Sequence, residues 1–261
     1  MYATLITVAA LWGAVTGLLV PRAAYRLSVR PDEEWRAACP AGHSFGGSVR
    51  GWLGGVRCRE CASARVPGGG PGGAAGGERP ERGVPAAAWV GALACAALAA
   101  ATGPRPELAV WLALTPVAVL LALVDRRVHR LPDRLTLPLA GAAVVLLGLA
   151  AVVPGAAGSW RRALLGGLVL GGAYFLLFVI HPGGMGFGDV KLALPLGVVL
   201  GWYGWGTLFL GAFAGFLFGS VYGFGLMALG RAGRRTAIPF GPFMIGGALA
   251  GLLLGGYGVP G

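Results

Sequence analysis

Three acidic residues are isolated in the C-terminal part of the chain. Between Leu108 and Gly261 the Asp and Glu residues are Asp125, Asp133 and Asp189, and no others. Acidic side chains in or beside long apolar segments cost free energy, and they are candidates for function by default. Two carboxylates held close together cannot both ionise easily, so one keeps a proton while the other activates water. These residues therefore suggest acid–base chemistry at a carboxylate pair.

Asp125 and Asp189 occupy comparable places in the sequence. Asp125 closes the apolar run WLALTPVAVLLALV, and Asp189 lies where a Gly-rich segment turns into the next apolar run. A simpler interpretation is that each is a solvated charge at a helix end, since the helix dipole favours a carboxylate at a helix start. Asp133 lies between two prolines and is expected to cap the helix that follows. The favoured pair, Asp125 with Asp189, is what an aspartic protease needs.

Cysteine and histidine form a second constellation. Cys39 and His43 stand in CPAGH, and Cys58 and Cys61 stand in CREC. Thiolates and imidazole at this spacing suit tetrahedral zinc, which would close a small domain with little core of its own. The alternative is free cysteines in a partly disordered loop. Cys95 lies in an apolar run and is expected to be an inert packing residue.

The composition excludes an ordinary soluble domain. Of the 261 residues 56% are hydrophobic and 12% charged, and the mean hydropathy is +0.73. About 20 helical residues span the hydrocarbon layer of a membrane. The composition therefore predicts a membrane protein with eight transmembrane helices. We expect these helices near 3–20, 86–103, 107–124, 135–153, 163–180, 189–203, 206–229 and 239–257.

The charged residues predict an orientation for these helices. The formal net charge is +11, and the basic residues lie between apolar runs, as the positive-inside rule requires, rather than in a stripe for nucleic acid. Arginines follow the first run and none precede it, which is opposite to a cleavable signal. Both termini are then outside, although Arg161 and Arg162 fall on the unexpected side. The segments expected on the cytoplasmic side are 22–85, 125–134, 181–188 and 230–237.

The predicted fold class is all-α, a polytopic membrane protein with a small cytoplasmic zinc-ribbon-like loop domain. Residues 1–21 form the first transmembrane helix. Residues 22–85 form the cytoplasmic Cys/His loop domain, which ends in the Gly-rich linker VPGGGPGGAAGG. Residues 86–261 form a seven-helix membrane domain. Glycines four residues apart predict close helix packing, as in Gly211/Gly215/Gly219 and Gly247/Gly251/Gly255.

Four segments carry a resemblance to a known family. GMGFGDVKL at 184–192 resembles a G-x-G-D signature, and LVDRRVHRLPDRLTLPL at 123–139 resembles the aspartate motif that accompanies it. The step Tyr25-Arg26-Leu27 and the segment IPFGPF at 238–243 add two further matches. Together they resemble the type IV prepilin leader peptidases over nearly the whole chain and in the right order.

The resemblance implies roles for particular residues. Asp125 and Asp189 would be the catalytic pair, with Asp133 a neighbour outside it. The two motif glycines would let the backbone turn tightly and approach a substrate strand, while the lysine would hold the loop or favour the ionised form of a neighbouring acid. These supporting residues are Gly186, Gly188 and Lys191. His129 and His181 flank the motifs and are expected to be solvated.

The resemblance also implies a substrate and cofactors. The family removes the short basic leader of type IV prepilins or pseudopilins, after a Gly and before an apolar helix, at the cytoplasmic face of the bacterial cytoplasmic (inner) membrane. Many members then methylate the new N-terminus with S-adenosylmethionine, although no Gly-rich nucleoside loop is evident here. Full-length members carry two C-x-x-C pairs, whereas here Gly42 replaces one Cys and His43 follows it.

Two other function classes compete with a peptidase. A proton-coupled transporter could use Asp125 and Asp189 as a relay, and a non-catalytic assembly factor would need neither. No internal repeat is evident, and no acid lies near a helix centre, which argues against transport. Both acids at one membrane edge favour hydrolysis.

Overall fold

The fold is known from a computed structural model. It describes residues 2–29, 33–39, 41–45, 48–54, 83–231, 233 and 238–258. Within these ranges the regular secondary structure is helical, with turns and loops between the helices and an isolated β-bridge between Ala38 and Ser44. The helices are α1 (Tyr2–Leu27), α2 (Ser48–Gly51), α4 (Gly83–Thr102), α5 (Glu107–Val128), α6 (Asp133–Ala151), α7 (Trp160–Ile180), α8 (Phe187–Tyr203), α9 (Trp205–Ala228) and α10 (Gly241–Tyr257).

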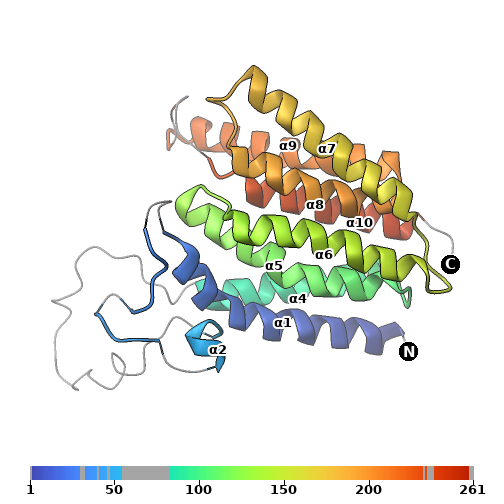
Figure 1. Ribbon diagram of the computed structural model, residues 1–261, viewed down its shortest axis with the longest axis horizontal. Helices are drawn as coiled ribbons and strands as arrows, with labels where there is room; N and C mark the ends of the chain where they lie inside the picture. The colour runs from blue at the N-terminus through green and yellow to red at the C-terminus, as the bar shows by residue number, and fades with distance from the viewer. Residues whose placement is uncertain are drawn as a thin grey trace.

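The eight long helices of the described chain lie side by side and reverse direction at each connection (Figure 1). The last turns of α1, α5, α7 and α9 and the first turns of α4, α6, α8 and α10 therefore share one end of the bundle. We call it the aspartate end, because it carries Asp125 and Asp189. The described residues around α2 lie at the same end. The described parts of the segments predicted to share one side do lie at this end (Figure 1), and its cytoplasmic placement stays a prediction.

Six helices among the described residues are long and apolar enough to cross a membrane. They are α1, α4, α5, α6, α7 and α9. The other two, α8 and α10, have 17 residues each, the lower limit for a span. Most of α8 is buried, because α6, α7, α9 and α10 surround it. An all-helical membrane fold is thus confirmed, whereas eight spans remain a prediction.

Glycines let the helices pack closely, as predicted. A Cβ added to Gly247 would lie 2.5 Å from the carbonyl oxygen of Gly211 and 2.3 Å from the backbone nitrogen of Gly215. Any larger residue would therefore push α10 away from α9. Between α7 and α8, a Cβ at Gly167 would lie 2.6 Å from the side chain of Val198. This packing fixes α8 and α10 against their neighbours, and both helices contribute to the aspartate end.

The first helix is longer than the sequence predicts. Its expected limit was residue 20, but α1 continues through Pro21 to Leu27. Proline has no N–H and disturbs the helix around it. Gly54 compensates, because its N–H donates to the Leu19 carbonyl (2.9 Å) and its own carbonyl accepts from Arg22 N–H (3.1 Å). The helix therefore persists because a distant loop residue satisfies its backbone.

Arginines stacked on aromatic rings hold the described part of the loop domain at the aspartate end. Distances from guanidinium carbon to ring centre are 4.0 to 5.3 Å, within cation–π range. The pairs are Arg22 with Phe45, Arg26 with Trp52, Arg36 with Tyr25 and Arg134 with Trp35. The last pair joins the loop domain to α6, one residue after Asp133.

Candidate active site

Asp125 lies in the last turn of α5 and is only 4% exposed. The helix extends to Val128, four residues past the expected limit. His129 ends it in the left-handed conformation (φ 51°), with its N–H donating to the Asp125 carbonyl at 2.8 Å. Arg126 and Arg127 favour this extension, because basic residues in a last turn complement the helix dipole. The Asp125 carboxyl thereby points inward from a regular helix.

A backbone amide from the other end of the sequence holds the Asp125 carboxyl. Gly241 N–H donates to Asp125 Oδ2 at 2.9 Å across 116 residues. Gly241 is the first residue of α10, where backbone N–H groups have no helical partner. A Cβ at Gly241 would lie 2.8 Å from the same oxygen and 3.2 Å from Asp125 Cγ. Glycine is therefore required for this approach.

Asp189 lies in the first turn of α8, half-buried. Its N–H donates to the Gly186 carbonyl at 3.0 Å, and its carboxyl makes a hydrogen bond with the Gly186 backbone. The Asp189 and Asp125 carboxyls interact electrostatically. The fold thus brings together the two aspartates favoured from the sequence, and each carboxyl has a glycine backbone beside it.

The two motif glycines differ in their surroundings, and their predicted approach to a substrate strand stays a prediction. Gly186 precedes α8 with φ −74° and ψ 142°, which other residues adopt readily, so the predicted tight turn is wrong there. Gly188 packs against the loop between α5 and α6 instead. A Cβ at Gly188 would lie 3.2 Å from Leu131 Cβ. Its small size therefore brings the segments that follow Asp125 and precede Asp189 into contact.

Asp133 does not cap α6, contrary to the expectation. Pro132 occupies the N-cap position, and no side chain caps the helix by a hydrogen bond. Asp133 Oδ1 instead lies 2.6 Å from Lys191 Nζ, which also lies 4.7 Å from the centre of the Phe187 ring. A nearby cation outcompetes the backbone for the carboxylate. Lys191 therefore joins α8 to α6 and pairs with Asp133 rather than with Asp189.

The predicted zinc ligands are described only in part. A β-bridge joins Ala38 to Ser44, and within it Cys39 Sγ lies 3.6 Å from His43 Nδ1. Cys58 and Cys61 lie outside the described residues, and no group of three ligand side chains occurs within them. The donor types and the contact of the first two fit a thiolate–imidazole site.

The remaining Cys and His predictions are confirmed. Cys95 is fully buried within α4 and packs in the main core. His129 and His181 are both exposed, at the ends of α5 and α7.

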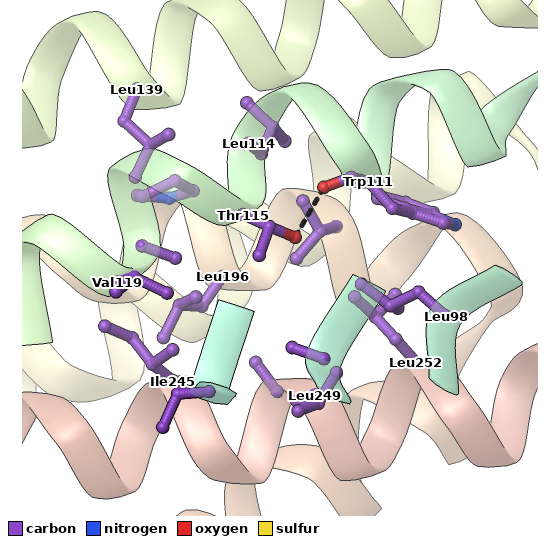
Figure 2. Close-up of a pocket in the computed structure, with 16 residues that line it drawn as sticks. Leu98, Trp111, Leu114, Thr115, Val119, Leu139, Leu196, Ile245, Leu249 and Leu252 are labelled. Atoms are coloured by element: carbon purple, nitrogen blue, oxygen red, sulfur yellow. Dashed lines mark hydrogen bonds between the residues drawn. The ribbon is translucent and has the colours of Figure 1, made fainter. Parts of the chain in front are cut away.

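An apolar pocket of about 120 Å³ lies deeper in the bundle, between α4, α5, α8 and α10 (Figure 2). Val119, Leu196 and Ile245 line it together with Trp111. Val119 precedes Asp125 by six residues, or about 9 Å along a helix. The pocket therefore lies on the interior side of the aspartates, between helices that also carry Asp125, Asp189 and Gly241.

Known proteins share the segment that contains both aspartates. Residues 112–224 match the type IV leader peptidase family. The resemblance predicted from the sequence is therefore confirmed. Three relatives named prepilin leader peptidase/N-methyltransferase come from Aeromonas salmonicida (strain A449), Burkholderia pseudomallei (strain 1026b) and Pseudomonas aeruginosa. Their identities are 37% over 142 residues, 34% over 172 residues and 37% over 145 residues.

The chain spans about half the length of the curated relatives it matches. The alignments cover 54%, 63% and 54% of this chain and 46%, 52% and 46% of these three relatives. No solved structure matches the chain. The family segment includes Asp125, Asp133 and Asp189, whereas Gly241 and the four predicted zinc ligands lie outside it.

Sequence reasoning missed two residues of this site. IPFGPF was noted only as a match, although its glycine, Gly241, contacts Asp125 directly. Tyr174 interacts electrostatically with Asp189 from the middle of an apolar run in α7. A tyrosine in such a run was the available signal, since its hydroxyl needs a polar partner when buried.

Proposed function

We propose that this protein is a membrane-embedded aspartic endopeptidase that removes the leader of type IV prepilins or pseudopilins. The observation that carries the proposal is the pairing of Asp125 and Asp189, which come from separate helices and interact at one end of the bundle. The family match and the relatives' names support it. They give no support to a proton-coupled transporter.

Two carboxyl groups are sufficient to hydrolyse a peptide bond by general acid–base catalysis. The ionised carboxylate accepts a proton from water as the water oxygen attacks the scissile carbonyl carbon, and the protonated carboxyl gives its proton to the carbonyl oxygen. The tetrahedral intermediate then collapses. The first aspartic acid protonates the leaving amine as the C–N bond breaks, and the second regains its proton from the intermediate's hydroxyl. Both carboxyls return to their starting states.

The surroundings of the pair suit a substrate that is polar on one side and apolar on the other. The aspartate end carries exposed basic and acidic loop residues, where water has access. The pocket on the interior side of the pair has an almost wholly apolar lining. A basic leader would stay at the end of the bundle while the following apolar segment stays at membrane depth. We place this end at the cytoplasmic face of the inner membrane, as the charge pattern predicts.

The test is cleavage of a prepilin by the purified protein in detergent or vesicles. The substrate carries a basic leader that ends in Gly before an apolar helix. We expect the leader to be released, and a product that begins anywhere else would contradict the proposal. We also propose methylation of the new N-terminus with S-adenosylmethionine, as the relatives' names suggest. The product mass measured with and without this cofactor shows whether a methyl group is added.

Asp133→Asn is expected to retain leader cleavage to within about threefold of the unchanged protein. Asp133 is 57% exposed, and an ion pair this exposed contributes at most about 1 kcal/mol. Its carboxylate lies against Lys191 rather than at the catalytic pair. Initial cleavage rates at matched membrane levels measure the effect. A complete loss of cleavage would place Asp133 in the catalytic machinery.

We propose a structural zinc ion held by Cys39, His43, Cys58 and Cys61. The contact between Cys39 and His43 supports it, as does the β-bridge between Ala38 and Ser44 that flanks them. Purified protein is expected to contain about one zinc per chain. Cys39→Ser should remove it, whereas Cys95→Ser, a matched change in the core of α4, should not. Elemental analysis after purification without chelator measures both, and an absence of zinc in the unchanged protein contradicts the proposal.

A further inference from the structure

Tyr174 is a buried polar residue at the edge of the aspartate pair. It lies in α7 and is only 3% exposed. Its ring stacks on Phe216 of α9, with centroids 5.6 Å apart and planes at 29°. It also contacts Phe240, 6.5 Å away between centroids, which directly precedes Gly241. The ring is therefore fixed against the segment whose next residue holds Asp125.

The packing of α7 against α8 independently places Tyr174 beside Asp189. Glycines set the register, since a Cβ at Gly167 would touch Val198 and one at Gly171 would touch Leu194. Because the helices are antiparallel, moving three residues along α7 to Tyr174 moves about the same number back along α8. Tyr174 then lies opposite residues 190–191, next to Asp189. The electrostatic interaction between the two agrees with this register.

The other polar groups near the site are already engaged. The Asp125 carboxyl accepts from Gly241 N–H, and Asp133 pairs with Lys191. The Tyr174 side chain is 3% exposed, and a tyrosine this enclosed usually directs its hydroxyl to a polar group within reach. Among the described carboxyls, Asp189 is the one that the register brings to Tyr174.

We propose that Tyr174 is a positioning residue that donates its phenol O–H to the Asp189 carboxylate, directly or through one water. The inference rests on the proposed peptidase function. A hydrogen bond to a carboxylate favours its charged state, so the Tyr174 hydroxyl would make Asp189 easier to ionise. Tyr174 thereby orients the Asp189 carboxyl and tunes its protonation.

Other titratable groups face the pair from several helices. The charge of Asp125 in α5 acts directly on Asp189. The charge of His129 acts on Asp125 rather than on Asp189. Lys191 of α8 and Asp133 of α6 neutralise each other. The described part of α10 contributes no ionisable side chain at this end. Tyr174 is thus the group whose removal should change Asp189 without changing the other charges.

The test is Tyr174→Phe, which keeps the stacked ring and removes only the hydroxyl, with Tyr222→Phe as matched control. Tyr222 lies in α9 and packs against the Phe243 ring, with centroids 5.2 Å apart and planes tilted by 43°. We expect Tyr174→Phe to lower kcat for leader cleavage about tenfold, with KM within about twofold. The acidic limb of the pH–rate profile should move to higher pH. The control should match the unchanged protein in all three.

A second readout does not need cleavage. Dicyclohexylcarbodiimide reacts with protonated carboxyls in membranes, and mass spectrometry locates the label at Asp189. The midpoint of labelling should move up by roughly one pH unit in Tyr174→Phe and stay unchanged in Tyr222→Phe. 3-Fluorotyrosine has nearly the shape of tyrosine but is a stronger hydrogen-bond donor. Placing it at position 174 should move the midpoint of Asp189 labelling to lower pH. This variant keeps the proposal testable if Tyr174→Phe does not fold.

Equal labelling midpoints in all these proteins would overturn the role of Tyr174. An unchanged protein that cleaves no prepilin would overturn the peptidase function instead, and the labelling midpoints would still decide whether Tyr174 acts on Asp189.

Discussion

Asp125→Asn and Asp189→Asn are each expected to abolish leader cleavage, with a loss of at least about 10³-fold. One carboxyl must accept a proton from water while the other donates one, so removing either should cost nearly as much as removing both. The amide has almost the size of the carboxyl. In Asp125→Asn its oxygen can still accept the Gly241 N–H, so the variant should keep the fold. The measurement is the ratio of leader-bearing to processed prepilin with time.

Both variants should insert into membranes at the level of the unchanged protein, and Asp133→Asn is the matched control. It removes a carboxylate eight residues away in the same motif. If Asp133→Asn is inactive and Asp125→Asn is active, the pair is Asp133 with Asp189. If all three variants cleave normally, the protein is not an aspartic protease.

Gly241→Ala is expected to lower leader cleavage by about 10- to 100-fold, although it changes no group that reacts. The new Cβ would lie 2.8 Å from Asp125 Oδ2, closer than the two atoms can approach, so the carboxyl must move. A displacement of about 1 Å at a catalytic group can cost about 10²-fold in rate. Initial rates at saturating substrate give kcat, and we expect the loss there rather than in KM.

Gly246→Ala is the matched control for this change. It lies in the same helix, five residues on, and a Cβ there would meet only the Phe218 ring at 3.7 Å, an ordinary contact. It should therefore cleave like the unchanged protein. Normal cleavage by Gly241→Ala would mean that the hydrogen bond between Gly241 and Asp125 does not position the carboxyl for catalysis.

The helices and the identity of the aspartates could be read largely from the sequence. Apolar runs of membrane length separated by short polar breaks define helices wherever they occur, because membrane insertion depends on the length and hydrophobicity of the run itself. The observed helices from α4 to α10 begin and end within four residues of the predicted limits. The rarity of acids after Leu108 in turn singled out Asp125 and Asp189, since an unneeded charge there is costly.

Contacts between distant segments decided the rest. The end of α1 depends on Gly54, the partner of Asp133 is Lys191 rather than its own helix, and the Asp125 carboxyl is held by Gly241. None of these partners has a local signature, because a glycine or a charge in a sequence does not state which segment will pack against it. By itself the sequence determined an all-helical membrane chain with a candidate aspartate pair. Only the packing of α5, α8 and α10 decided that the carboxyls meet and which backbone amide holds Asp125, since both follow from how closely glycines let these helices approach.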